Sequence, residues 1–598
     1  MTRPRGRPAG ALARTSAARA KAIFYLLLAF ALYVGARYWI VQIRDGPKLA
    51  LRAYEQHVTT DDFAALRGAI YDRDGGVLVR SLPSQSVYVT TSDVTEPKAT
   101  AAALARALGG EPTAADVLAL LQRHDAYVQV EHKISRERAT ALAKLALPGV
   151  SIVPEETGVR FAPSGRLAST VLGFTGFDEN GLDGLESAFD TTLRGEPGRM
   201  TLEGDEFGRA LPFAQPHVVV AAKPGRSLVL TLDSYLQFAT EQVLRETVAR
   251  WHAQDGSAIV MDPNSGEILA LANAPDYDLR DYRHSTADQR RDRAVTDVYE
   301  PGSTFKLVTI GTALDSGMVT PDQRFAAVDA LSVGGRVIRN ADDGMMASAL
   351  GTESLAQIVA YSHNVGAAEV GLAIGKRVLD RGIRRFGFGE PTDVELPGES
   401  PGILLPVADW SASSLPTIAF GQGIATTPLA MARAYCAIAN GGLLMRPRIV
   451  FATLDSTGAV VSRTHPIVVR RVLTPRTAAL LRGYLRDVVT HGTGRGVAEV
   501  PGYTTAGKTG TAEIAENGYY QAGAYVASFI GMVPATSPRF VILVKITRPR
   551  GSIYGGTVAA PAFAKLAKIV MMHAGIEPAR APIAVAKSVP AAASKPST

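Results

Sequence analysis

The chain has 598 residues, of which 46% are hydrophobic and 20% are charged. This length is enough for more than one domain, and this composition excludes a largely disordered chain. The formal net charge is +7, but much of the excess lies in the first 21 residues. The body has no basic stripe, which excludes a nucleic-acid-binding role. Because Cys436 is the single cysteine, no intrachain disulfide is possible, and we expect this residue to lie in the core.

An apolar segment, residues 22–43, follows a basic tail of residues 1–21. About 20 apolar residues are needed to cross a bilayer, so we expect a single transmembrane anchor here. Arg37 lies toward one end of the segment, where its side chain can reach the headgroups. The basic residues before the segment predict a cytoplasmic N-terminus and an outward-facing body. Residues 34–36 resemble a signal-peptide cleavage site, but apolar residues continue beyond them, which favours an uncleaved anchor.

Residues 44–225 predict a first domain of mixed structure. Residues 67–75 are typical of a strand that runs into an Asp-Gly turn. Residues 99–123 and 134–146 are rich in alanine and leucine, which predicts helices. At the other end of the chain, residues 574–598 are rich in Ala, Pro, Lys and Ser, and we expect a disordered tail there.

Residues 226–573 predict a second domain of the α+β class. Asp233 is placed to cap a helix that begins at Ser234, and residues 257–273 have the pattern of a β-hairpin. Further strands are expected at residues 227–232, 504–513, 526–533 and 540–546. Since helical sequence fills most of the space between the two groups of strands, we expect a central antiparallel sheet of about five strands covered by helices.

The motif Ser303-Thr-Phe-Lys306 opens a predicted helix. Lys306 lies three residues after Ser303 and therefore on the same helix face. A neutral amine there can take the serine proton, while the helix N-terminus favours developing negative charge. The amine must first lose its own proton, and a nearby second cation such as Lys508 would promote that loss.

A second motif, Ser362-His-Asn364, follows an apolar run and precedes another predicted helix. Residues two apart on a turn can point to one side. We expect Ser362 to relay a proton to the leaving amine and Asn364 to hold a substrate amide.

The third motif, Lys508-Thr509-Gly510-Thr511, lies in a predicted strand. Gly510 leaves room for another backbone, so a substrate peptide can pair with this edge. Lys508 and Thr509 are expected to bind a carboxylate, and the amides of Thr511 and Ser303 to form an oxyanion hole. Residues 502–509 also match a phosphate-loop pattern, but strand sequence continues where a helix should begin. The ten histidines are scattered, so we expect no metal, and no cofactor is predicted.

In this order the three motifs match a known serine acyl-enzyme pattern. Together with their flanking sequence they resemble the class B penicillin-binding proteins, and in particular the FtsI type that acts in cell division. The flanking segments that carry the resemblance are residues 299–306, 427–432, 533–535 and 554–563, and in the first domain 67–75 and 181–186. The resemblance implies a pedestal domain at 44–225 and a penicillin-binding transpeptidase domain at 226–573.

The same resemblance implies a D,D-transpeptidase in which Ser303 attacks the D-Ala-D-Ala end of a peptidoglycan stem peptide. The acyl group then passes to an amine on a neighbouring stem peptide, and β-lactams trap Ser303. The implied partners are a SEDS-type glycosyltransferase and divisome membrane proteins, at the cytoplasmic membrane, with the catalytic domain periplasmic or extracytoplasmic. The implied role is septal cell-wall synthesis.

The sequence departs from the family pattern at two positions. His363 stands where the family often has serine, and Ala162 stands where tyrosine usually precedes Pro163. Three alternatives remain open. An elongation-type transpeptidase shares the motifs, a D,D-carboxypeptidase would pass the acyl group to water, and a β-lactamase would need a deacylation base, for which no Glu-x-x-Leu-Asn is present.

Overall fold

The computed structural model of the chain describes residues 10–63, 65–123, 127–154, 158–203, 217–341, 347–516 and 518–579. The chain divides into two compact units, one of residues 1–65 and 196–223 and one of residues 66–195 and 224–598. The predicted basic tail up to residue 9 and the predicted disordered tail from residue 580 lie outside the described residues.

The first unit carries the predicted apolar helix. Helix α1 spans Gly10–Trp39 and continues through a π-helical turn, Ile40–Arg44, to α2, Gly46–His57. Within the described part of the chain, residues 17–44 form the one helix long and apolar enough to cross a membrane by length and composition. The helix begins before residue 22 because the preceding residues are rich in alanine, a strong helix former. A three-stranded antiparallel sheet completes this unit, in the order β1 (Val58–Phe63), β8 (Gly198–Glu203), β9 (His217–Val220).

The second unit begins with a six-stranded sheet that joins distant segments. Its order is β19 (Val460–Arg463), β18 (Val450–Leu454), β10 (Ser227–Leu230), β2 (Ile70–Tyr71), β3 (Val77–Leu82) and β7 (Val159–Phe161). Strands β2 and β10 pair in parallel, with Ile70 opposite Leu228. Sheet hydrogen bonds therefore connect strands from both sides of residue 225, which is the predicted boundary between the two domains.

A small α/β lobe packs on its own apolar cluster within this unit. Strands β4 (Gln85–Thr90), β5 (Tyr127–Ile134) and β6 (Val150–Pro154) form one sheet, covered by α3 (Pro97–Leu108), α4 (Ala114–Leu121) and α5 (Arg136–Ala143). Residues 99–123, predicted to be helical, form two helices with a break between them. Gly109 ends α3 in the left-handed region at φ 90°, and Thr113 starts α4 with a capping box to Asp116.

The central sheet of the second unit confirms the predicted antiparallel arrangement of five strands. Its order is β12 (Ile268–Ala274), β11 (Asp255–Met261), β23 (Phe540–Thr547), β22 (Tyr519–Val533) and β21 (Ala506–Glu516), and every neighbouring pair is antiparallel. All residues of β11, β12 and β23 are buried. This complete burial explains why these strands read as nearly continuous apolar runs, because both faces are covered.

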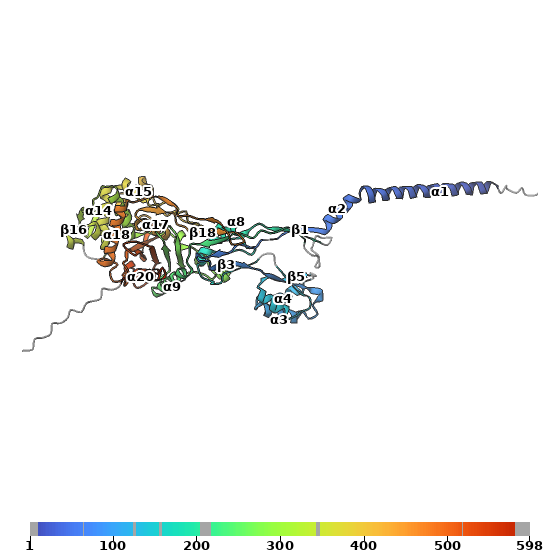
Figure 1. Cartoon of the computed structure of the whole chain (residues 1–598), viewed down its shortest axis with the longest axis horizontal. Helices are drawn as coiled ribbons and strands as arrows, with labels where there is room; N and C mark the ends of the chain where they lie inside the picture. Colours follow the sequence, from blue (N-terminus) through green and yellow to red (C-terminus); the bar gives the residue numbers. More distant parts are fainter. Residues whose placement is uncertain are drawn as a thin grey trace, which may run out of the picture. The chain divides into compact units, whose positions relative to one another are not determined.

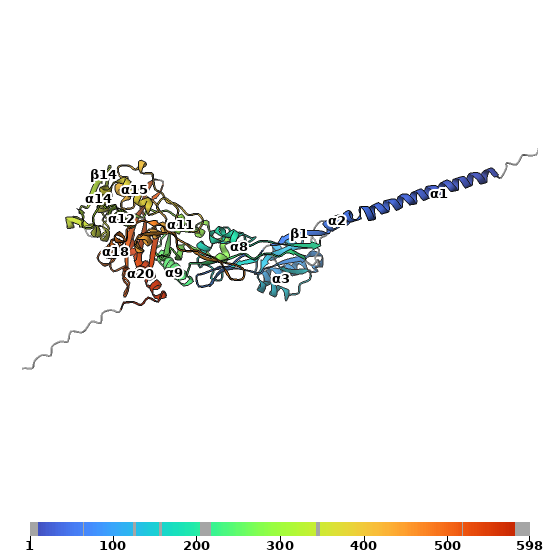
Figure 2. The ribbon, with the colours of Figure 1, turned by 45° about the horizontal axis from the view of Figure 1, so that its top comes forward.

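Alternate residues of the sheet point into two separate cores. Helices α9 (Ser234–Arg250) and α20 (Ala560–His573) cover one face and lie side by side (Figures 1 and 2). Helices α12 (Lys306–Asp315) and α17 (Pro428–Ala439) belong to the core on the opposite face. As predicted, Asp233 caps α9, accepting a hydrogen bond of 3.0 Å from the Leu236 amide. The sheet thus fixes α12 and β21, the two elements that carry the first and third motifs.

The chain between β12 and β21 contains mostly helices and short hairpins. The remaining elements that bear on the site are β13 (Arg324–Ala326), β14 (Ala330–Val333), β15 (Arg336–Arg339), β16 (Thr352–Ser354), α13 (Leu355–Ala360), α14 (Asn364–Ile374), α15 (Lys376–Arg385), α18 (Pro475–Thr490) and α19 (Gly555–Val558).

Candidate active site

Ser303 lies in a short 3₁₀ turn, Gly302–Phe305, that leads directly into α12. Three hydrogen bonds hold this turn. The Gly302 amide donates to the Gly421 carbonyl at 3.0 Å, the Thr304 hydroxyl donates to the Pro301 carbonyl at 2.7 Å, and the Tyr435 hydroxyl donates to the Thr304 carbonyl at 2.9 Å. Burial raises the pKa of Tyr435, so its hydroxyl stays a donor. The serine therefore sits on a rigid support at a helix start, as predicted.

Two buried lysine amines converge on one hydroxyl. Lys306 Nζ lies 3.4 Å from Ser362 Oγ, and Lys508 Nζ donates to the same oxygen at 2.9 Å. Both lysines have no exposed surface. Their amines are therefore no more than about 6 Å apart. At this distance two positive charges repel by about 3 kcal/mol for an effective dielectric constant of 20.

The second motif turns both of its polar ends toward Lys306. The Lys306 amine donates to the Ser362 carbonyl at 2.5 Å and to Asn364 Oδ1 at 2.9 Å. Ser362 has a φ of 63°, a left-handed conformation that is uncommon for a residue with a side chain. This backbone turn lets residues two apart face the same amine, as the sequence predicts, and joins the end of α13 to the start of α14.

His363, between these two residues, points into the protein instead. Its Nδ1 lies 2.5 Å from Glu353 Oε2, and both side chains are almost completely buried. Glu353 belongs to β16, ten residues earlier in the chain. His363 therefore forms a buried contact between the second motif and β16. The polar groups of this motif that contact Lys306 are those of Ser362 and Asn364.

Strand β21 is the last strand of the sheet and pairs only with β22 among the described residues. It holds all four residues of the third motif. Thr509 Oγ1 lies 2.7 Å from Thr493 Oγ1, and Lys508 Nζ also donates to the Thr509 carbonyl at 3.2 Å. A Cβ atom added to Gly302 would lie 3.2 Å from the Thr511 carbonyl, so the serine turn touches this strand. The strand continues to Glu516 with no helix start at Lys508, which rules out the phosphate-loop alternative.

Gly510 allows other groups to approach its backbone closely, and the groups that do so belong to two other segments of this chain. A Cβ atom on Gly510 would lie 2.4 Å from Ser528 Oγ and 3.0 Å from Thr304 Cγ2. A Cβ atom on Gly555 would in turn lie 2.4 Å from the Gly510 carbonyl. Glycine at 510 is therefore required by packing within the protein, independently of any substrate.

A cleft with a volume of about 420 Å³ opens beside the motifs. Its lining includes Asn364, Thr511 and Glu513, the aromatic side chains Phe420 and Tyr554, and both arginines of β15. The β15 hairpin is tied to the second motif, because Asn364 Nδ2 donates to the Arg339 carbonyl at 3.0 Å. A serine hydroxyl at a helix start, two buried amines and a neighbouring cleft are components that acyl transfer through a covalent intermediate can use.

Sequence reasoning did not find Thr493, Glu353 or Tyr435, which hold the motif residues in place. Each is joined to its motif only by folding, and no local pattern marks it. Within the described ranges, no group of three His, Cys, Asp or Glu side chains could hold a metal ion.

Comparisons with known families match most of the chain. Residues 256–568 match the family described as "Penicillin binding protein transpeptidase domain". Residues 62–230 match the family described as "Penicillin-binding Protein dimerisation domain".

Curated relatives align over nearly the whole chain. Stage V sporulation protein D of Bacillus subtilis is 33% identical over 572 residues, which cover 94% of this chain and 86% of that protein. Peptidoglycan D,D-transpeptidase FtsI of Escherichia coli is 30% identical over 566 residues, covering 92% and 91% of the two chains.

Solved structures show the same architecture. Penicillin binding protein 3 from Mycobacterium tuberculosis, complexed with aztreonam, has a TM-score of 0.67 and 28% identity, and the alignment covers 87% of this chain and 99% of that one. Penicillin Binding Protein 2X from Streptococcus thermophilus has a TM-score of 0.72 and 26% identity, covering 87% and 81%.

The buried pair of His363 and Glu353 gives a stability prediction. Replacing Glu353 by Ala leaves the imidazole without its carboxylate, and we expect the free energy of unfolding to fall by about 3 kcal/mol. Urea unfolding of the purified chain measures this loss. Asp322→Ala, at an exposed position, is the matched control. Equal unfolding free energies for the two variants would show that the pair does not hold the second motif.

Proposed function

The chain belongs to the class B penicillin-binding proteins, and from this membership we propose a mechanism and a cellular role for it. The enzyme is a serine-type peptidoglycan D,D-transpeptidase, with both the transpeptidase and the dimerisation domain of the family. The finer assignments, which are the role of each site residue, the domain limits, the septal role and the partners, are our proposals.

In the proposed first step, Ser303 Oγ attacks the carbonyl of the penultimate D-alanine of a stem peptide. Lys306 takes the hydroxyl proton, and the amides of Ser303 and Thr511 stabilise the oxyanion. Support comes from the rigid turn that holds Ser303 and from the contact of this turn with β21. β-Lactams would enter the same site and leave Ser303 acylated.

Ser362 is proposed to relay the proton to the leaving D-alanine. The observation that carries this assignment is the convergence of Lys306 and Lys508 on Ser362 Oγ, at 3.4 and 2.9 Å. One hydroxyl between two amines can accept a proton from one side and donate one on the other. Asn364 then orients the substrate amide. After the D-alanine has left, the acyl group remains bound to Ser303 Oγ as an ester.

The substrate peptide is proposed to pair with β21 along Thr509, Gly510 and Thr511 as an added strand. The outer edge of β21 supports this, because β22 is its one strand partner in the described ranges. Lys508 and the Thr509 hydroxyl are assigned to the terminal carboxylate of the donor, which is lost with the D-alanine.

For the domain limits we propose a tail (1–21), an anchor (22–43), a pedestal (44–225), a transpeptidase domain (226–573) and a C-terminal tail (574–598). The apolar helix supports anchoring in the cytoplasmic membrane, with the catalytic domain outside.

The FtsI relative supports a septal role, and we propose a SEDS-type glycosyltransferase and divisome proteins as partners.

Fluorescent penicillin tests the nucleophile. We expect Ser303→Ala to abolish covalent labelling, with at least a hundredfold loss of signal, while the chain unfolds at the same temperature as the wild type. Ser316→Ala, at the exposed C-terminal end of α12, is the matched control and should be labelled fully. Labelling of the Ser303 variant at another serine would overturn the assignment.

Cross-linking of the full chain in growing cells tests the septal role. We expect it to recover a SEDS-type glycosyltransferase together with division proteins. A variant in which residues 22–43 are replaced by an unrelated membrane helix is the control, and it should recover less of these partners if the anchor contributes to the contact. Recovery of elongation proteins instead would assign the chain to cell elongation.

A further inference from the structure

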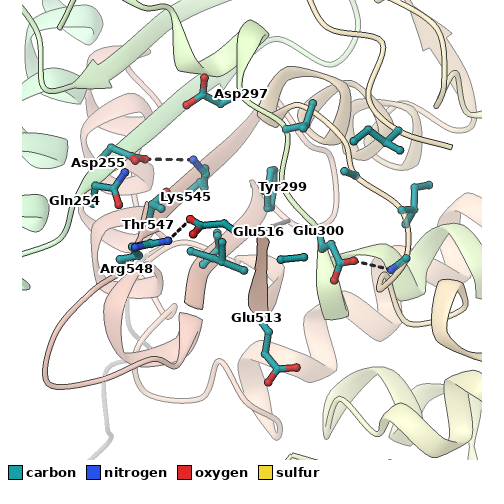
Figure 3. Close-up of a pocket in the computed structure, with 18 of the residues that line it drawn as sticks. Gln254, Asp255, Asp297, Tyr299, Glu300, Glu513, Glu516, Lys545, Thr547 and Arg548 are labelled. Atoms are coloured by element: carbon teal, nitrogen blue, oxygen red, sulfur yellow. Dashed lines mark hydrogen bonds and ion pairs between the residues drawn. The ribbon is translucent and has the colours of Figure 1, made fainter. Parts of the chain in front are cut away.

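A second, larger cavity lies next to the active-site cleft. Its volume is about 660 Å³, and its lining comes from the segment just before Ser303, the end of β21, β23 and residues 403–405 (Figure 3). Ile403 and Leu405 are more than half exposed at its rim. None of the residues proposed to bind the donor peptide lines this cavity.

Most charged side chains in the cavity wall are paired with one another. Asp255 accepts a hydrogen bond from Lys545 at 3.3 Å, and Glu516 forms an ion pair with Arg548. Figure 3 shows both pairs apart from Glu300 and Glu513. Among the described residues, neither of these two glutamates has an ion-pair partner within 4.0 Å.

Glu300 is held in place by neutral donors. The Gly423 amide donates to Glu300 Oε1 at 2.8 Å, and the Tyr520 hydroxyl donates to Oε2 at 3.1 Å. Burial raises the pKa of Glu300. The positive charge of Arg336 lowers this pKa, and the negative charge of Glu513 raises it. The geometric basis for a cation site is that both carboxylates line this one cavity. A cation bound there would favour the charged form of each.

Glu513 lines both this cavity and the active-site cleft, so the two are adjacent at this residue. Glu300 lies three residues before Ser303 and two residues before the turn that presents it. A ligand in the larger cavity with a cationic end between Glu300 and Glu513 would therefore lie beside the position of the acyl-enzyme.

We propose that this cavity binds the second substrate of the transpeptidase, a stem peptide that carries a primary ammonium group, with Glu300 and Glu513 holding that group. The proposal rests on the transpeptidase function and names the acceptor site of the same reaction. The apolar rim at Ile403 and Leu405 would contact the uncharged part of the peptide.

The transfer step balances with the groups present. The ammonium group gives one proton to a glutamate carboxylate, and the neutral nitrogen attacks the ester carbonyl on Ser303. The new C–N bond forms as the bond from carbon to Ser303 Oγ breaks. The second proton of the nitrogen passes to Ser303 Oγ, which restores the hydroxyl. The glutamic acid then returns its proton to water. A pair of carboxylates at this position thus favours an amine over water as the acceptor.

The partition of the acyl-enzyme between amine and water tests this site. The full chain, in detergent, is given a thioester donor that acylates Ser303 and a soluble stem peptide with a free amine as acceptor. We expect Glu513→Gln and Glu300→Gln each to lower the ratio of aminolysis to hydrolysis product at least fivefold. Glu577→Gln, at an exposed position away from the cavity, is the matched control and should leave the ratio unchanged.

A steric variant tests the cavity without removing a charge. Ala515 is an exposed residue of the lining, and Ala515→Trp should fill part of the cavity and also lower the ratio. Unchanged ratios in all three cavity variants, with Ser303 still labelled by penicillin, would overturn the acceptor site but leave the transpeptidase assignment intact. Absence of any acyl-enzyme in the wild-type chain would instead refute the proposed function.

Discussion

The meeting of Lys306 and Lys508 at the Ser362 hydroxyl is the constraint on which the rest of the site depends. Two fully buried amines about 6 Å apart or closer cannot both be charged without a cost of about 3 kcal/mol. Burial adds to that cost, because it disfavours the charged form of each amine. This repulsion is the physical basis of the proposal that Lys306 acts as the neutral base for Ser303.

The fold keeps these three residues together although they lie far apart in the sequence. Lys306 is on α12, Ser362 on the turn between α13 and α14, and Lys508 on the edge strand β21. The central sheet positions β21 and packs against the core that contains α12. The buried contact between His363 and Glu353 also holds the turn at Ser362, so a side-chain pair outside the site supports the polar geometry within it.

The local parts of this arrangement could be predicted from the sequence. The cap at Asp233, the helix after Ser303 and the two lysine motifs all follow from residues within a few positions of each other. Glu353 could not be predicted as the partner of His363, because no spacing rule links a short strand to a turn ten residues later. The six-stranded sheet through Ile70 and Leu228 was also missed, since strand pairing over such distances depends on tertiary packing. Gly109 and Thr113 are typical of a helix end and a helix start, so the break between α3 and α4 could have been predicted. The prediction relied instead on the alanine and leucine content of the whole segment.

The pH dependence of acylation tests the central claim most directly. Stopped-flow measurement of the rate at which a penicillin acylates the full chain, from about pH 6 to about pH 9, follows the protonation of the group that activates Ser303. If Lys306 acts as a neutral base beside Lys508, the rate falls as the pH drops, approaching roughly tenfold per pH unit at the acidic end. A flat profile across this range, with the chain folded throughout, would contradict the account.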